Sequence, residues 1–217
     1  MAVKVALLQM QTGPDRDENL AKAEDLLTVA AGEGADLAVL PEMFAIPYAT
    51  ELMLKHREPL DGETAALLKR TAAANHINIL GGTFPEARED GRCHNTALFV
   101  DRNGEVQGVY RKTHLFDVDF KGVHFRESEA VAPGDSVTVV NSEFGKIGIA
   151  VCFDLRFPGL FRRLAADGAW LVLVPAVFTV ATGQAHWELL ARSRALDNQL
   201  FVCGCQGASA PGAAFDP

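Results

Sequence analysis

Short apolar runs alternate with segments of helical periodicity along this chain, and this alternation limits the fold more than any other feature. Helical periodicity is found at residues 17–34, 64–76, 160–168 and 185–198, and strand-like runs at 4–10, 35–42, 77–84, 146–152, 169–175 and 199–205. Two further strand-like runs flank Asn103-Gly104, a strong β-hairpin signal. Because strands that alternate with helices favour parallel pairing, we predict an α/β fold with a largely parallel, mixed sheet and an irregular stretch at 113–135.

The composition indicates a sizeable core and little affinity for polyanions. The chain has 217 residues, 48% of them hydrophobic, and we expect a single domain over 1–217. Its formal net charge of −8 argues against binding to nucleic acid or to an anionic membrane surface. No run of about 18 uncharged apolar residues is present, and the first ten residues alternate as a strand rather than as a signal peptide. We therefore expect a cytoplasmic protein.

The four cysteines are Cys93, Cys152, Cys203 and Cys205. Their spacing is not that of a disulfide framework or a CxxC pair, which predicts reduced thiols. Cys203 and Cys205 lie two residues apart in a strand-like run, so we expect them to pack on one face.

Three reactive side chains follow strand-like runs: Glu42, Lys112 and Cys152. In open α/β sheets, ligands bind beyond the carboxyl ends of the strands. Taken singly, each residue has an ordinary interpretation, because a glutamate after proline is usually a solvated loop residue, a lysine beside arginine is usually surface charge, and a lone cysteine is usually a buried apolar residue.

Together, the three residues form a chemical set. A cysteine that attacks a carbonyl group needs a base for its proton, a donor for the oxyanion and an acid for the leaving group. Glu42, Lys112 and Cys152 can fill these roles. Pro158 suits the first turn of a helix, and a helix N-terminus close to Cys152 would favour the thiolate.

Three segments resemble the signatures of the nitrilase superfamily, the carbon–nitrogen hydrolases: LPEMF (40–44), YRKTHLFD (110–117) and VCFDLRFP (151–158). The resemblance implies a four-layer α-β-β-α sandwich and a catalytic triad of Glu42, Lys112 and Cys152. It also implies that no metal or organic cofactor is needed. Finally, it implies a homodimer or larger homo-oligomer that forms through the helices at 160–168 and 185–198.

Within the superfamily, the segments at 114–128 and 182–199 are most similar to the ω-amidase branch. That resemblance implies hydrolysis of the terminal amide of small α-keto acid amides, such as α-ketoglutaramate, through a thioester. In such enzymes a second glutamate lines the pocket and helps to place the substrate, and Glu127 stands at the matching position. The neighbouring branch, which removes the amide from deaminated glutathione, gives the alternative substrate.

Further substrate contacts are expected at Tyr48, Phe153, Phe178 and Thr179, and the backbone N–H of Phe153 is expected to bind the oxyanion. Phe153 and Thr179 stand where an ω-amidase often has Tyr and Asn. These departures affect the expected substrate preference more than the expected chemistry.

Other hypotheses start from the same residues. His186 and Asn198 follow Cys152, so a Cys-His-Asn hydrolase is formally open, but no papain-like signature surrounds Cys152 and a structural role is favoured for His186. The six histidines form no ligand motif for a metal hydrolase. Arg156 could bind a substrate carboxylate, although pairing with an acidic neighbour inside the fold is favoured.

The chain stops at residues 215–217, before the closing strands and C-terminal extension that resembling families usually carry. We therefore expect the C-terminal part of the fold to be incomplete. A family-fold protein that serves only as a binding or assembly subunit is the non-enzymatic alternative.

Overall fold

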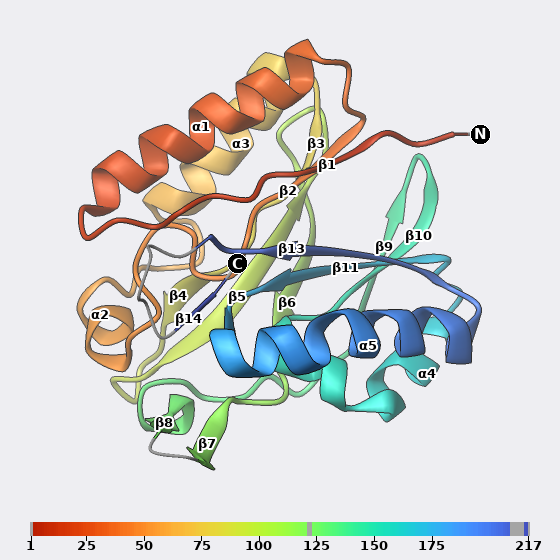
Figure 1. Ribbon diagram of the computed structural model, residues 1–217. Coiled ribbons are helices and arrows are strands. Elements are labelled where there is room, and N and C mark those ends of the chain that lie inside the picture. Colours follow the sequence, from red (N-terminus) through yellow and green to blue (C-terminus); the bar gives the residue numbers. More distant parts are fainter. Residues whose placement is uncertain (1, 121–122, 209–214, 217) are drawn as a thin grey trace.

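The computed structural model describes residues 2–120, 123–208 and 215–216. Two sheets are stacked face to face, and helices cover the outer face of each (Figure 1). The layers therefore run helices, first sheet, second sheet, helices. This order confirms the predicted α/β class and the four-layer α-β-β-α sandwich.

The N-terminal half builds the first sheet. Its strands are β1 (Val5–Leu7), β2 (Leu37–Val39), β3 (Asn78–Leu80), β4 (Phe84–Ala87), β5 (Cys93–Val100) and β6 (Val106–Arg111). β1, β2 and β3 pair in parallel, whereas β5 pairs antiparallel with β3, β4 and β6. β5 and β6 form the hairpin predicted around Asn103-Gly104. The sheet is therefore mixed, as predicted.

The C-terminal half builds the second sheet, in the order β13-β11-β10-β9. Its strands are β9 (Thr138–Ser142), β10 (Gly145–Ile149), β11 (Leu171–Ala176) and β13 (Phe201–Gln206). β10, β11 and β13 are parallel, and β9 is antiparallel to β10. The carboxyl ends of β10, β11 and β13 therefore lie at the same edge of the sheet, and so do the loops that follow these strands.

Four longer helices form the outer layers (Figure 1). α1 (Arg16–Gly32) and α3 (Glu63–Asn75) cover the first sheet, and α4 (Pro158–Ala166) and α5 (Val180–Asn198) cover the second. Asp15 caps α1 by accepting hydrogen bonds from the backbone N–H groups of Asp17 and Glu18. The apolar stripe of α1, which includes Leu20 and Leu27, is buried.

Two apolar cores hold these layers together. Leu27, Leu68 and Ile79 belong to the core between the first sheet and its helices. Phe99 and Ile149 belong to the larger core, which takes in both sheets and α4. Because sequence-distant strands meet in the second core, residues at the ends of β2, β6 and β10 can form one site.

Shorter elements lie around one end of the two sheets. They are α2 (Thr50–Lys55), β7 (Asp117–Phe120), β8 (Val123–Arg126), β12 (Phe178–Thr179), β14 (Phe215–Asp216) and the 3₁₀ turns η1 (Glu127–Glu129) and η2 (Cys152–Arg156). β7 and β8 pair antiparallel as a hairpin that projects from this end (Figure 1). Residues 121–122, between these two strands, lie outside the described residues.

Three predicted boundaries are wrong. The stretch 113–135 is not irregular, because it holds the β7–β8 hairpin, whose strands are too short and too charged to stand out as apolar runs. The predicted strand 77–84 divides into β3 and β4, since Gly82 has a φ of 48°. The last helix begins at Val180 rather than 185, because Thr179 caps it by accepting a hydrogen bond from the Thr182 N–H.

β9 was not predicted. Among the helices that the structure describes, none is long and apolar enough to cross a membrane.

Candidate active site

Glu42, Lys112 and Cys152 come together at one end of the two sheets. Glu42 follows β2, Lys112 follows β6, and Cys152 begins the turn after β10, so the first sheet supplies two of the residues and the second sheet supplies the third. The side chains are almost fully enclosed, with exposures of 1% for Glu42, 0% for Lys112 and 6% for Cys152. Lys112 Nζ lies 2.9 Å from Glu42 Oε1. The predicted strand-end residues therefore share one buried cluster.

Glu42 and Cys152 also meet at the backbone of Val177. The Val177 N–H donates to Glu42 Oε2 over 3.0 Å, and the Cys152 thiol donates to the Val177 carbonyl over 3.5 Å. The thiol and the Glu42 carboxylate are close enough for each to shift the pKa of the other. A carboxylate in this place can receive the thiol proton directly.

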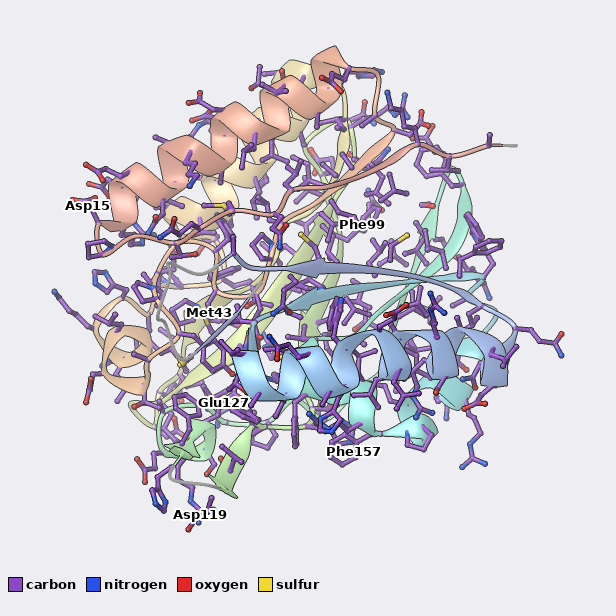
Figure 2. The ribbon with its side chains drawn as sticks, viewed as in Figure 1. Asp15, Met43, Phe99, Asp119, Glu127 and Phe157 are labelled. Atoms are coloured by element: carbon purple, nitrogen blue, oxygen red, sulfur yellow. The ribbon has the colours of Figure 1, made fainter. Side chains whose placement is uncertain are left out.

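The loop that carries Glu42 has a special backbone conformation. Met43 has a φ of 49°, and its N–H donates to the Thr83 hydroxyl over 2.9 Å. Gly82 passes so close that a Cβ there would lie 2.1 Å from the Pro41 carbonyl oxygen. The segment after β3 therefore holds the Glu42 loop in place, and Met43 and Glu127 are seen at the same end of the molecule in Figure 2.

Cys152 sits at the start of η2 with a φ of 46°, in the left-handed region that residues other than glycine seldom occupy. Such backbone strain persists only where the surrounding structure enforces it. Asp154, two residues on, is fully buried and accepts a hydrogen bond of 2.8 Å from the Val151 N–H. The turn therefore has an internal support beside the thiol.

Asp154 also joins the Cys152 turn to the end of β6. Its carboxylate accepts hydrogen bonds from the Tyr110 hydroxyl at 2.7 Å, from the Thr113 hydroxyl at 3.1 Å, and from the His114 backbone N–H at 3.1 Å. His114 Nδ1 lies 2.7 Å from the same carboxylate. Since Tyr110, Thr113 and His114 flank Lys112, this carboxylate connects the segment of the lysine to that of the thiol.

Lys112 Nζ is surrounded by acceptors on several elements. It lies 2.9 Å from Glu127 Oε2 and 3.2 Å from the Tyr48 hydroxyl, in addition to Glu42. The Glu127 carboxylate also accepts the Phe116 N–H at 2.6 Å. Asn95 Nδ2 donates to both Glu42 Oε1 and Glu127 Oε1, each over 2.9 Å. The Lys112 ammonium and the Asn95 amide therefore each donate hydrogen bonds to both buried carboxylates, Glu42 and Glu127.

These surroundings shift the pKa values of the cluster. Burial, with the nearby Glu127, raises the pKa of Glu42 above 4.5, although Lys112 opposes this rise. Burial alone would lower the pKa of Lys112, but the carboxylates of Glu127 and Glu42 outweigh it and raise that pKa. Lys112 is therefore a permanent cation in this site.

The expectation of a Cys152 thiolate is wrong. Burial, together with the Glu42 carboxylate, raises the pKa of the Cys152 thiol well above its ordinary value of 9.0. Pro158 does open a helix, but α4 begins six residues after Cys152, and η2 lies between them. The resting residue is therefore a neutral thiol that needs a base.

A small pocket, with a free volume of about 10 Å³, opens onto Cys152. It is lined by Phe116, Cys152, Phe153, Arg156, Val177, Phe178, Thr179 and Thr182. Phe153, Phe178 and Thr179 therefore lie where substrate contacts were expected. Glu127 and Tyr48 are not in this lining and contact Lys112 instead.

Arg156 brings a positive charge to this pocket. Its guanidinium lies 5.4 Å from the centre of the Phe153 ring and 5.7 Å from that of Phe178, and its Nη2 lies 3.3 Å from His186 Nδ1. Among the described residues, Arg156 forms no ion pair and its buried Nε has no hydrogen-bond partner. The expectation of an acidic partner for Arg156 is therefore wrong for this part of the chain.

Asn95, Asp154 and Thr182 are not among the residues that the sequence predicts. Asn95 could have been noticed as a polar residue inside the otherwise strand-like run 93–100. Asp154 could have been noticed because it lies two residues after Cys152. His186 contacts Arg156 of the pocket lining, and its structural role stays a prediction.

Comparison with known proteins identifies the family. The carbon–nitrogen hydrolase family model matches residues 4–212. The chain is 41% identical to hydrolase C26A3.11 of Schizosaccharomyces pombe, over 94% of this chain and 64% of that protein. It is 40% identical to omega-amidase NIT2-B of Xenopus laevis, over 92% of this chain and 72% of that protein.

A solved structure agrees with these sequence matches. Nit3 of Saccharomyces cerevisiae, a member of branch 10 of the nitrilase superfamily, superimposes with a TM-score of 0.89 at 34% identity, over 99% of this chain and 79% of that one. The chain spans slightly less than two thirds of its S. pombe relative, at 64%. By sequence and by fold, this chain belongs to the carbon–nitrogen hydrolase family, within the nitrilase superfamily.

Proposed function

We propose that this protein is a cysteine-dependent amidase that hydrolyses the terminal amide of small α-keto acid amides. The buried cluster of a thiol, a carboxylate and an ammonium carries the proposal, because this set can deprotonate the thiol and stabilise the oxyanion beside one pocket. The name of the Xenopus relative, an omega-amidase, agrees with it.

In the proposed mechanism, Glu42 takes the proton of the Cys152 thiol while the sulfur attacks the amide carbonyl. Lys112 and the Phe153 N–H stabilise the oxyanion that forms. Glu42 then protonates the leaving nitrogen, so that ammonia departs and a thioester remains. Glu42 next takes a proton from water, whose oxygen attacks the thioester, and the carboxylic acid is released with the thiol restored. No metal or organic cofactor enters these steps.

Glu127 and Tyr48 act on Lys112 in this proposal. Two carboxylates and a phenol oxygen around one buried ammonium fix its position and keep it charged. We propose that Glu127 influences substrate placement through Lys112 and through Phe116, whose backbone N–H donates a hydrogen bond to the Glu127 carboxylate. Phe153, Phe178 and Thr179 are proposed to touch the substrate directly.

The substrate class follows from Arg156. A guanidinium that lines the pocket without an ion-pair partner among the described residues suits a substrate that brings its own carboxylate. An α-keto acid amide such as α-ketoglutaramate carries a carboxylate at one end and the amide at the other. We propose that Arg156 binds the first while Cys152 attacks the second.

A substrate panel tests this assignment. Hydrogen bonds to charged groups contribute about 1.5–3 kcal/mol, so Arg156→Gln should raise KM for α-ketoglutaramate by roughly 10- to 100-fold. The same variant should hardly change kcat/KM for a neutral amide of similar length. Equal losses on both amides would contradict the carboxylate role. Deaminated glutathione as the best substrate by tenfold or more would instead assign the neighbouring activity.

We also propose that the protein forms a homodimer or larger homo-oligomer through α4 and α5, and that it is cytoplasmic. On α5, Leu189 and Leu196 are 64% and 81% exposed, and a partner subunit packed on this helix would cover them. All four cysteines are unpaired, as in a reducing compartment.

A further inference from the structure

Asn95 lies at the centre of the candidate site although it does not line the pocket. It belongs to β5, all eight of whose residues are buried, and its own side chain is 0% exposed. Its backbone carbonyl accepts the Lys112 N–H over 2.9 Å, so β5 also fixes the start of the lysine loop. The side chain therefore has a rigid support on a central strand.

The amide nitrogen of Asn95 connects two carboxylates. Asn95 Nδ2 lies 2.9 Å from Glu42 Oε1 and 2.9 Å from Glu127 Oε1, which uses both of its hydrogens. The reverse orientation would place Oδ1 against two acceptor oxygens. Oδ1 has no hydrogen-bond partner among the described residues, although an unpaired buried acceptor destabilises a fold. The two carboxylates therefore determine how this side chain points.

The contacts of Glu42 show what Asn95 adds. Its Oε2 accepts the Val177 N–H, and its Oε1 accepts from both Lys112 and Asn95. These three donors come from different segments, so the plane of the carboxylate is fixed beside the Cys152 thiol.

We propose that Asn95 is a positioning residue that holds Glu42 and Glu127 in one arrangement and maintains Glu42 as a carboxylate able to take the thiol proton. This inference rests on the proposed role of Glu42 as the base. The uncharged Asn95 thus bonds to both carboxylates, as Lys112 does.

The physical consequence is a change in the acidity of Glu42. The ionisable groups that face Glu42 are Lys112, Glu127, Cys152 and Tyr48. A hydrogen-bond donor favours the charged form of a carboxylic acid, and the negative charge of Glu127 disfavours it. Without the Asn95 amide, the pKa of Glu42 should rise further above 4.5.

The decisive variant is Asn95→Leu, which removes the donor and fills a similar volume. The readout is the pKa of Glu42, measured by ¹³C-carboxyl NMR with the signal assigned through Glu42→Gln. We expect an upward shift of about one pH unit, and the acid limb of kcat/KM should move with it. Asn95→Ser retains one O–H donor and should give a smaller shift in the same direction, which keeps the test valid if Asn95→Leu does not fold.

Thr96→Val is the matched control. Thr96 is the next residue of β5, is also 0% exposed, and donates to a buried carboxylate outside the site, Glu86, over 2.8 Å. Thr96→Val should lower the melting temperature without moving the Glu42 titration or the acid limb. Asn95 variants whose Glu42 titration matches the wild type would overturn the inference, even in an active enzyme. If the Asn95 variants shift the Glu42 titration but the wild-type protein hydrolyses no amide, the inference would stand and the proposed function would be contradicted.

Discussion

Cys152 combines two features that make most thiols inert. It is 6% exposed, and burial beside Glu42 raises its pKa well above 9.0. Reactivity in such a residue has to come from a base within reach rather than from a preformed thiolate. Glu42 meets that need because its carboxylate and the thiol are held at the same residue, Val177, and because its own pKa is raised.

The pH dependence of activity follows from these shifts. The active form has an ionised Glu42 and a neutral thiol, so kcat/KM should fall as the pH drops through the raised pKa of Glu42, above 4.5. Because the pKa of Cys152 lies well above 9.0, kcat/KM should stay level from neutral pH to about pH 9. A pH–rate profile of the purified enzyme checks both limbs.

Glu42→Gln should abolish turnover at every pH in the same assay. An acid limb near the ordinary histidine pKa of about 6.5, which disappears in His186→Ala, would contradict the account and favour a cysteine–histidine pair.

At the scale of elements, the η2 turn carries the strain and Asp154 supports it. A residue other than glycine in the left-handed region costs on the order of 1–3 kcal/mol, and Cys152 has such a backbone, with a φ of 46°. The Asp154 carboxylate accepts hydrogen bonds from the preceding Val151 N–H and from three residues around Lys112. This carboxylate therefore maintains both the turn and its distance from the lysine loop.

Asp154→Asn tests this support. The amide nitrogen would face donors that now reach a carboxylate, so we expect the free energy of unfolding to fall by about 2–3 kcal/mol. We also expect kcat to fall with little change in KM, because the thiol loses its position while the pocket keeps its lining. Urea unfolding and steady-state kinetics measure the two effects.

Thr113→Val is the control for Asp154→Asn. It removes one donor to Asp154 but leaves the bond from Val151, and it should retain most of kcat. Full kcat in Asp154→Asn would show that the turn needs no such support.

The sequence predicts strand-end residues better than it predicts their supports. Glu42, Lys112 and Cys152 follow clear apolar runs, so their meeting could be expected from the α/β pattern. Asn95 and Asp154 could not be found in this way, because their partners are 53 and 44 residues away in the chain, at Glu42 and Tyr110. The thiolate expectation failed because burial and the Glu42 carboxylate raise the pKa of the Cys152 thiol, and the position of the helix after it signals neither effect.

At the scale of the molecule, the sandwich places its two sheets so that their strand ends face one pocket. The outer face of α5 remains exposed on the opposite side of its layer, and within Val180–Asn198 the buried residue is Arg194. Arg194 Nε donates to the Leu155 carbonyl over 3.1 Å, which ties this helix to the Cys152 turn. An assembly formed through the outer face of α5 would therefore be linked to the Cys152 turn through this helix.

Leu196→Glu tests the proposed assembly. A charge at this 81% exposed position should lower the affinity between subunits and shift the protein toward monomer in light scattering at micromolar concentration. Val29→Glu, at a 59% exposed position on α1 in the other outer layer, should leave the oligomer unchanged. A wild-type protein that is already a clean monomer would contradict the assembly, and an unaltered Leu196→Glu oligomer would place the interface elsewhere.

The central claim, that Cys152 forms a thioester with the amide substrate, is tested most directly by acid quench during turnover of α-ketoglutaramate, followed by peptide mass spectrometry. The account predicts an acyl adduct on the peptide that contains Cys152, and no adduct on Cys93, Cys203 or Cys205, although Cys203 is the more exposed thiol. Cys152→Ala should keep its fold and lose both the adduct and turnover. An adduct on another cysteine, or turnover that persists in Cys152→Ala, would contradict the account.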